Sequence, residues 1–203
     1  MKLSNRVLAA VLLPAALVSL SGCGVNSVPT AEENAKAKWA NVQADYQRRA
    51  DLIPNIVEAV KGEANFEKSV LEGVINARAS ATKTTIDASN LTPEKIKEVA
   101  AVQGQFGQAI GRLLSVSEQY PQLRSNAAFG ELRAQLEGTE NRIKVSRNEY
   151  NASVKDYNIS VRTFPSNIFA GMFGFGQKGE FEADKGAEKS PSLKGAFDPK
   201  PAQ

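Results

Sequence analysis

Large apolar side chains recur every seven residues between positions 30 and 165, the spacing of helices that each bury one face. Three such series are present, separated by polar or proline-containing segments. They comprise Trp39, Tyr46, Ile53 and Val60, then Val99, Phe106, Leu113 and Tyr120, then Phe129, Leu136, Ile143, Tyr150, Tyr157 and Phe164. Strand-like alternation of apolar and polar residues is not found before residue 165. The pattern therefore predicts an all-α protein.

The first series predicts one long helix over residues 31–81. Thr30 and Glu33 stand at the spacing of a capping box, which predicts that the helix starts there. Pro54 lies inside the helix, where a proline kinks or breaks the backbone. Because the apolar stripe keeps its phase across Pro54, we expect a kink at this position. The polar segment 83–90 predicts the loop that follows.

The second and third series predict two further long helices. Residues 92–94 (Thr-Pro-Glu) form a typical helix start, and Pro121 ends that helix. The third begins at residues 125–126 and stops at Pro165. Three long helices with short turns predict an antiparallel up-down-up bundle. The alternative is a parallel coiled coil between chains, and the short turn at Pro121 favours folding back within one chain.

The N-terminus has the form of an export signal. Lys2 and Arg6 give it a positive start, and the apolar stretch 7–20 is shorter than the roughly 20 residues of a membrane span. Residues 20–23 (Leu-Ser-Gly-Cys) match the bacterial lipobox, in which the cysteine receives diacylglycerol before cleavage. The alternative is an uncleaved hydrophobic anchor.

The only cysteine of the chain, Cys23, stands where the lipobox requires it. We therefore expect residues 1–22 to be a lipoprotein signal peptide, Cys23 to carry lipid, and residues 23–29 to form a flexible tether. A multiply acylated cysteine is a stable membrane anchor. Gly24 replaces the aspartate that would indicate inner-membrane retention, which favours the outer membrane and a domain that faces the periplasm.

Composition restricts the chemistry. The chain has one cysteine and no histidine, so it lacks an internal disulfide and the commonest general base and metal ligand. We predict no cofactor and no metal. The 25 basic and 22 acidic residues are mixed along the chain, whereas nucleic-acid binding needs a clustered basic face. We therefore expect no nucleic-acid partner.

Several longer motifs occur in a fixed order. They are residues 46–55 (YQRRADLIPN), 120–123 (YPQL), 129–132 (FGEL), 136–143 (LEGTENRI), 150–151 and 157–158 (both YN), and 164–165 (FP). Together they resemble the LemA family of bacterial envelope proteins, over residues 35–182. The resemblance implies a membrane-anchored helical domain, here placed at residues 30–182, that faces away from the cytoplasm. It implies an envelope protein partner of unknown identity and no particular activity.

Polar residues on the first and third helices are candidates for a partner-binding groove near Pro54. They are Arg48, Arg49, Asp51, Asn55, Glu137, Glu140, Asn141 and Arg142. The simpler interpretation is a set of ion pairs on the helix surface, in which Arg48 or Arg49 reaches across to Glu137 or Glu140. Paired carboxylates can also act as acid and base. The sequence thus predicts a non-enzymatic scaffold or adaptor, with a carboxylate-based hydrolase of cell wall or peptide as the alternative.

An apolar segment follows the third helix. Its candidate contact residues are Phe169, Met172, Phe173 and Phe175. We expect them to cap the end of the bundle, and the alternative is a contact with a protein or a membrane. Residues 174–179 match G-x-G-x-x-G but lack the flanking strand and helix of a dinucleotide site. The polar segment 183–203 predicts a disordered tail.

Overall fold

The computed structural model describes residues 26–63 and 66–182. The predicted signal peptide, Cys23 and the C-terminal tail lie outside these residues. The described chain is helical and contains no strand, which confirms the all-α prediction. Its helices are α2 (Ser27–Lys61), α3 (Lys68–Lys83), α4 (Pro93–Ser117), α5 (Pro121–Ser125), α6 (Ala127–Arg162) and α7 (Ser166–Phe173).

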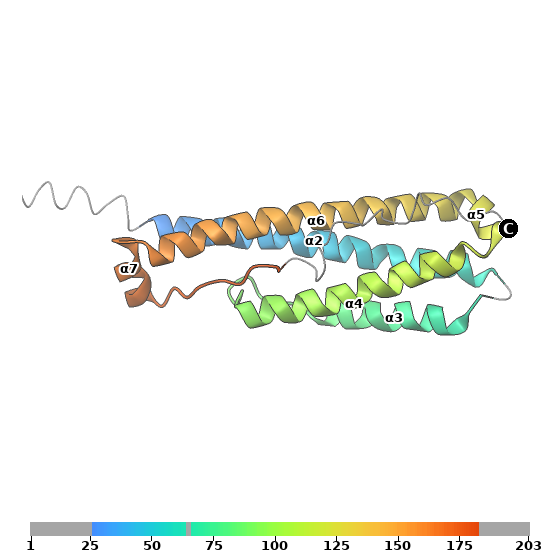
Figure 1. Cartoon of the computed structure of the whole chain (residues 1–203), viewed down its shortest axis with the longest axis horizontal. Helices are drawn as coiled ribbons and strands as arrows, with labels where there is room; N and C mark the ends of the chain where they lie inside the picture. Colours follow the sequence, from blue (N-terminus) through green and yellow to red (C-terminus); the bar gives the residue numbers. More distant parts are fainter. Residues whose placement is uncertain (1–25, 64–65, 183–203) are drawn as a thin grey trace, which may run out of the picture.

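Four long helices form an antiparallel bundle (Figure 1). The helices α2 and α6 lie side by side over most of their length, and α3 and α4 form a second pair packed against them. Because α3 and α4 are shorter, α2 and α6 extend beyond them at the end where α2 begins. The short helix α5 lies at the opposite end, and α7 lies at the end where α2 begins.

The prediction of a single helix over residues 31–81 is wrong, and with it the count of three main helices. The helix ends at Lys61, and the chain reverses and resumes at Lys68 as α3. Gly62 is a poor helix former, and Phe66 packs against Tyr120 at the turn with ring centroids 5.0 Å apart. Pro54, in contrast, lies inside α2 without ending it.

Helix α2 also begins earlier than the capping box predicts. It starts at Ser27, so the flexible tether predicted for residues 23–29 is wrong for residues 27–29. Val28 in its first turn is buried, and Pro29 occupies a position where the missing N–H needs no partner. Burial of the first turn therefore extends the helix on the N-terminal side of Thr30.

The other predicted helix starts are confirmed. Thr92 directly precedes Pro93, the first residue of α4, and its hydroxyl accepts a hydrogen bond from the Lys95 N–H. The Asn126 side chain accepts two backbone N–H groups at the start of α6. These caps satisfy backbone donors that have no partner within the helix.

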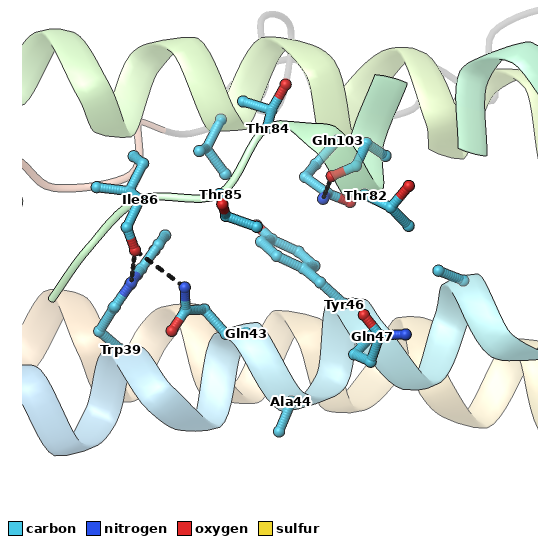
Figure 2. Close-up of a pocket in the computed structure, with 13 residues that line it drawn as sticks. Trp39, Gln43, Ala44, Tyr46, Gln47, Thr82, Thr84, Thr85, Ile86 and Gln103 are labelled. Carbon is cyan, nitrogen blue, oxygen red and sulfur yellow. Dashed lines mark hydrogen bonds between the residues drawn. The ribbon is translucent and has the colours of Figure 1, made fainter. Parts of the chain in front are cut away.

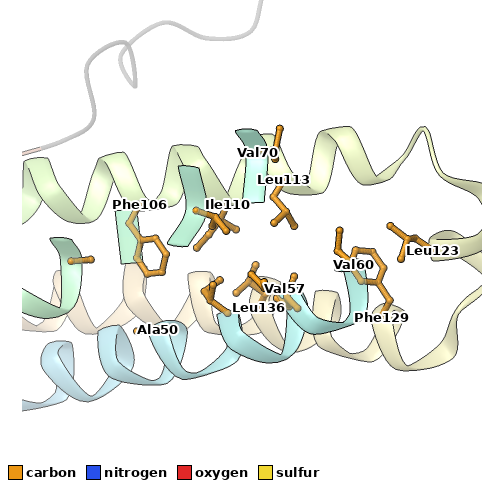
Figure 3. Packing of buried hydrophobic residues seen from close by; sticks show 14 residues of the cluster. Ala50, Val57, Val60, Val70, Phe106, Ile110, Leu113, Leu123, Phe129 and Leu136 are labelled. Carbon is orange, nitrogen blue, oxygen red and sulfur yellow. The ribbon is translucent and has the colours of Figure 1, made fainter. Parts of the chain in front are cut away.

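The core has two parts. Near α5 it is mainly aliphatic and is built from all four long helices (Figure 3), including Val57, Val60, Val70, Ile110, Leu113 and Leu136. Towards the other end it is richer in aromatic side chains, with Trp39, Tyr46, Tyr150 and Phe181. Phe181 comes from residues 175–182, an extended segment after α7 that we call the strap. The strap therefore completes the core where α2 and α6 extend beyond α4.

Candidate functional site

Two asparagines of α6 hold the backbone of the strap. Asn158 accepts a hydrogen bond from the Lys178 N–H (2.9 Å) and donates to the Lys178 carbonyl (3.0 Å). Asn151 makes the same pair of bonds with Phe181, both at 2.8 Å. Each carboxamide thus satisfies both polar groups of one extended residue, as a neighbouring strand would.

Two tyrosines next to these asparagines extend the ladder. The Tyr157 hydroxyl donates to the Gly176 carbonyl and the Tyr150 hydroxyl to the Gly179 carbonyl, both at 2.9 Å. We call Tyr150–Asn151 and Tyr157–Asn158 the Tyr-Asn dyads. They lie seven residues apart in α6, a rise of about 10.5 Å, and the strap residues that they bind lie three extended residues apart, about 10 Å, so the two spacings match. Burial raises the pKa of Tyr157 to about 12 and that of Tyr150 still further, so both remain donors.

Side chains of the strap also contact the bundle. Lys178 is buried, pairs with Glu32 of α2 at 2.9 Å and lies 4.8 Å from the centroid of the Tyr157 ring. Burial opposes the charged form of Glu32, but the hydrogen bonds and charges of Lys178 and Lys36 together outweigh it and lower the pKa of the carboxyl. Phe181 stacks on Trp39 with ring centroids 6.1 Å apart.

The backbone of the strap approaches α4 closely. The Gly179 N–H donates to the Leu91 carbonyl at 2.8 Å. A Cβ atom at Gly179 would lie 2.6 Å from the Cα atom of Pro93, so only glycine fits. In the sequence, Gly179 stands out only as the last glycine of the G-x-G-x-x-G match at residues 174–179. The repeated Tyr-Asn dyads were the available signal for the strap.

A groove lies between α2 and the α3–α4 connection (Figure 2). We call it the α2–α3 groove. Its volume is about 310 Å³, and its lining includes Gln43, Tyr46, Gln47, Thr82, Thr84, Thr85 and Gln103. At one side Trp39 Nε1 and Gln43 Nε2 both donate to the Ile86 carbonyl, at 3.3 and 3.0 Å. The lining contains no charged side chain, so the groove offers hydrogen bonds and apolar contact.

Arg49 is buried next to this groove, where it contacts Gln103 of the groove lining. Its guanidinium pairs with Glu140 of α6 at 2.8 Å and donates to the carbonyl and side-chain oxygens of Gln103 in α4. It also lies 4.8 Å from the centroid of the Phe106 ring. The predicted ion pair between the first and third predicted helices is therefore confirmed for Arg49 and Glu140, but Arg49 is buried and not on the helix surface as predicted. It joins three helices of the bundle.

The remaining predicted groove residues do not form one site. Arg48 and Arg142 line a groove of about 460 Å³ between α2 and α6, which we call the α2–α6 groove. Asn141 lines an adjacent depression with Arg142. Asp51 accepts a hydrogen bond from Gln47 on the helix surface, and Asn55 is exposed.

The two candidate carboxylates have different partners. Glu140 pairs with Arg49, whereas Glu137 is exposed and pairs with Arg133 at 3.1 Å. Each carboxylate is thus bonded to its own arginine, and the two do not share a partner. Among residues 26–63 and 66–182, no group of His, Cys, Asp and Glu side chains could hold a metal ion.

The apolar residues after α6 are divided between the bundle and its surface. Phe169 and Phe175 are half-buried, but Met172 and Phe173 are exposed. The prediction that the segment caps the bundle is therefore wrong for Met172 and Phe173. Helix α7 rests on α6 and α2 through its other face, where Ser166 and Ala170 are buried.

Comparison with known proteins identifies the family. The model of the LemA family matches residues 38–194. The chain belongs to the LemA family. Similar LemA relatives are the magnetosome proteins MamQ 1 and MamQ 2 of Paramagnetospirillum magneticum, both 27% identical over 189 residues, and MamQ of Magnetospirillum gryphiswaldense, 28% identical over 189 residues. Each match covers 83% of this chain and 68% of the relative.

The dyads, the strap and the Arg49–Glu140 pair all lie within the segment that the LemA model matches. Within the described residues, none of the helices of this LemA protein has the length and apolar character needed to cross a membrane.

Proposed function

We propose that this LemA-family chain is a membrane-associated envelope protein, anchored by lipid on Cys23, that acts as a non-enzymatic adaptor. Family membership and the lipobox at residues 20–23 support the membrane association. The proposed location is the periplasmic face of the outer membrane, because Gly24 follows the cysteine.

The uncharged lining of the α2–α3 groove is the observation that carries the adaptor role. Glutamine and threonine side chains line it beside the Tyr46 ring, which suits a polypeptide segment held by hydrogen bonds and apolar contact. We propose that an envelope protein binds there. The α2–α6 groove with Arg48 and Arg142 is the second candidate surface for the same partner.

Two adjacent residues of α2 line different candidate surfaces, so crosslinking from each can distinguish the surfaces. Gln47 lines the α2–α3 groove, and Arg48 lines the α2–α6 groove. We expect a photo-crosslinking amino acid at position 47 of the full chain to give one discrete product in native membranes, and the same amino acid at exposed Lys144 to give none. Products from position 48 alone would move the partner to the α2–α6 groove. Crosslinks at neither position would contradict the adaptor role.

The alternative is an envelope hydrolase that uses Glu137 and Glu140. The separate arginine partners of the two carboxylates favour the adaptor. The purified full chain should therefore release no product from peptidoglycan or peptides. Turnover that is lost in Glu137→Gln or Glu140→Gln, and kept in Glu72→Gln at an exposed position of α3, would establish the hydrolase.

The anchor has its own test. Cys23→Ala should leave an uncleaved precursor or release the domain from the membrane fraction. Mass spectrometry of the membrane-bound protein should find lipid on Cys23. An unmodified Cys23 in that fraction would contradict the lipid anchor.

A further inference from the structure

An exposed apolar face lies at one end of the bundle. Its residues are Phe164 (75% exposed), Ile168 (54%), Met172 (75%) and Phe173 (69%). Positions 168 and 172 are four residues apart in α7, which places them on one side of that helix. Phe164 lies in the turn that leads into α7, and Phe173 is its last residue. The other large apolar residues that are exposed in the described chain, Ile75, Val145 and Ile159, lie on α3 and α6. A cluster of this kind usually marks a contact surface.

This face lies beside the start of α2. The hydroxyl oxygens of Ser27 and Ser166 are 3.3 Å apart, which joins the first turns of α2 and α7. Figure 1 shows both at the same end of the bundle. Ser27 is four positions after Cys23, a stretch of chain that spans at most about 14 Å. Lipid on Cys23 therefore keeps α7 close to the bilayer surface.

We propose that the α7 face, formed by Phe164, Ile168, Met172 and Phe173, inserts into the headgroup region of the lipid bilayer as a second attachment beside Cys23. The proposal rests on the proposed lipid anchor. Apolar helix faces bind at the membrane interface in this way, without spanning the membrane.

Three features favour lipid as the occupant. The eight residues of α7 include no charged side chain, so none would have to enter the apolar region. Exposed Arg162 lies two residues before Phe164, where its charge can remain among lipid headgroups. The chain length from Cys23 brings the bilayer within reach.

The face is also held in a fixed position. Gly174 has a φ of 73°, which ends α7 in the left-handed conformation, and Phe175 N–H donates to the Ala170 carbonyl at 2.9 Å. The strap that follows is bonded to α6. Helix α7 is thus fastened at both ends, and its apolar side needs no rearrangement to meet a membrane.

A fluorescent label tests the proposal on the full lipidated chain. Acylation blocks Cys23, so Met172→Cys supplies a unique thiol for an environment-sensitive dye. The protein is reconstituted in vesicles of phosphatidylethanolamine and phosphatidylglycerol. Nitroxide-labelled lipids should quench the dye at position 172 several-fold more than a dye at Val145→Cys, an exposed apolar control on α6. Circular dichroism checks that both variants are folded.

The outcomes distinguish this proposal from the proposed anchor. Equal, weak quenching at positions 172 and 145 in vesicle-bound protein would overturn the α7 contact and leave the lipid anchor intact. A dye at position 172 that is shielded in native membranes but exposed in lipid vesicles would assign the face to a protein and overturn the contact with lipid. A chain that leaves the membrane fraction entirely would contradict the anchor itself.

Discussion

Arg78 of α3 donates a hydrogen bond from Nε to the carbonyl oxygen of Ala50 in α2, at 2.7 Å. In a regular helix that carbonyl accepts the N–H of residue 54, but Pro54 has none. Arg78 therefore supplies the donor that the proline removes, from a neighbouring helix. This explains how α2 continues through an interior proline.

A double-mutant cycle tests this compensation. Arg78→Met should lower the free energy of unfolding by about 1–3 kcal/mol, because the buried Ala50 carbonyl loses its donor. In a Pro54→Ala background the backbone N–H returns, so the same substitution should have a much smaller effect. Urea denaturation gives both values. Equal losses in the two backgrounds would show that Arg78 acts independently of the proline.

Gly179→Ala should detach the strap. The added Cβ atom would meet Pro93 at 2.6 Å, whereas a Cβ atom at Gly176 meets nothing within 4 Å. We expect faster amide hydrogen exchange over residues 175–182 and a change in Trp39 fluorescence as Phe181 withdraws. Gly176→Ala is the matched control and should behave as the parent. Unchanged exchange in Gly179→Ala would contradict the close approach.

The asparagine ladder predicts a difference between two positions of one helix. Asn151→Ala removes two hydrogen bonds to Phe181 and should lower the free energy of unfolding by about 1–3 kcal/mol. Asn148→Ala, at an exposed position of α6, should change it by less than about 0.5 kcal/mol. Denaturant titrations of the two variants give the comparison, and similar values would argue against the ladder.

The Glu32–Lys178 pair predicts a dependence of stability on pH. The folded state lowers the pKa of Glu32, so the ionised carboxylate stabilises the fold above its ordinary pKa. This contribution is lost as the pH falls through the lowered pKa. Melting curves from about pH 7 to about pH 3 should give the parent a higher melting temperature than Glu32→Gln at neutral pH. The difference in melting temperature should close in acid. A gap that persists in acid would assign the effect to another cause.

The heptad pattern predicted α4 and α6 well because their apolar stripes and caps are local signals. The same pattern failed over residues 31–81, because two antiparallel helices joined by a turn can show the same spacing of apolar residues as one long helix. The decisive contacts at that turn, such as Phe66 on Tyr120, join residues far apart in sequence.

The strap was missed for a different physical reason. Its backbone is recognised by the side chains of Asn151 and Asn158, and an extended segment bound in this way has no periodicity of its own. Met172 and Phe173 were expected to be buried because they are apolar, but burial also requires a neighbouring surface to cover them. That surface is not supplied by the described part of the chain.

The 36 residues of α6 make a rod about 54 Å long. If the end with α7 sits on the bilayer, the α5 turn stands at the far tip of that rod, and the two grooves lie part-way along it. The bundle then sets a fixed height above the membrane at which a partner is met, so shortening α2 and α6 by matched heptads should move that partner closer to the membrane.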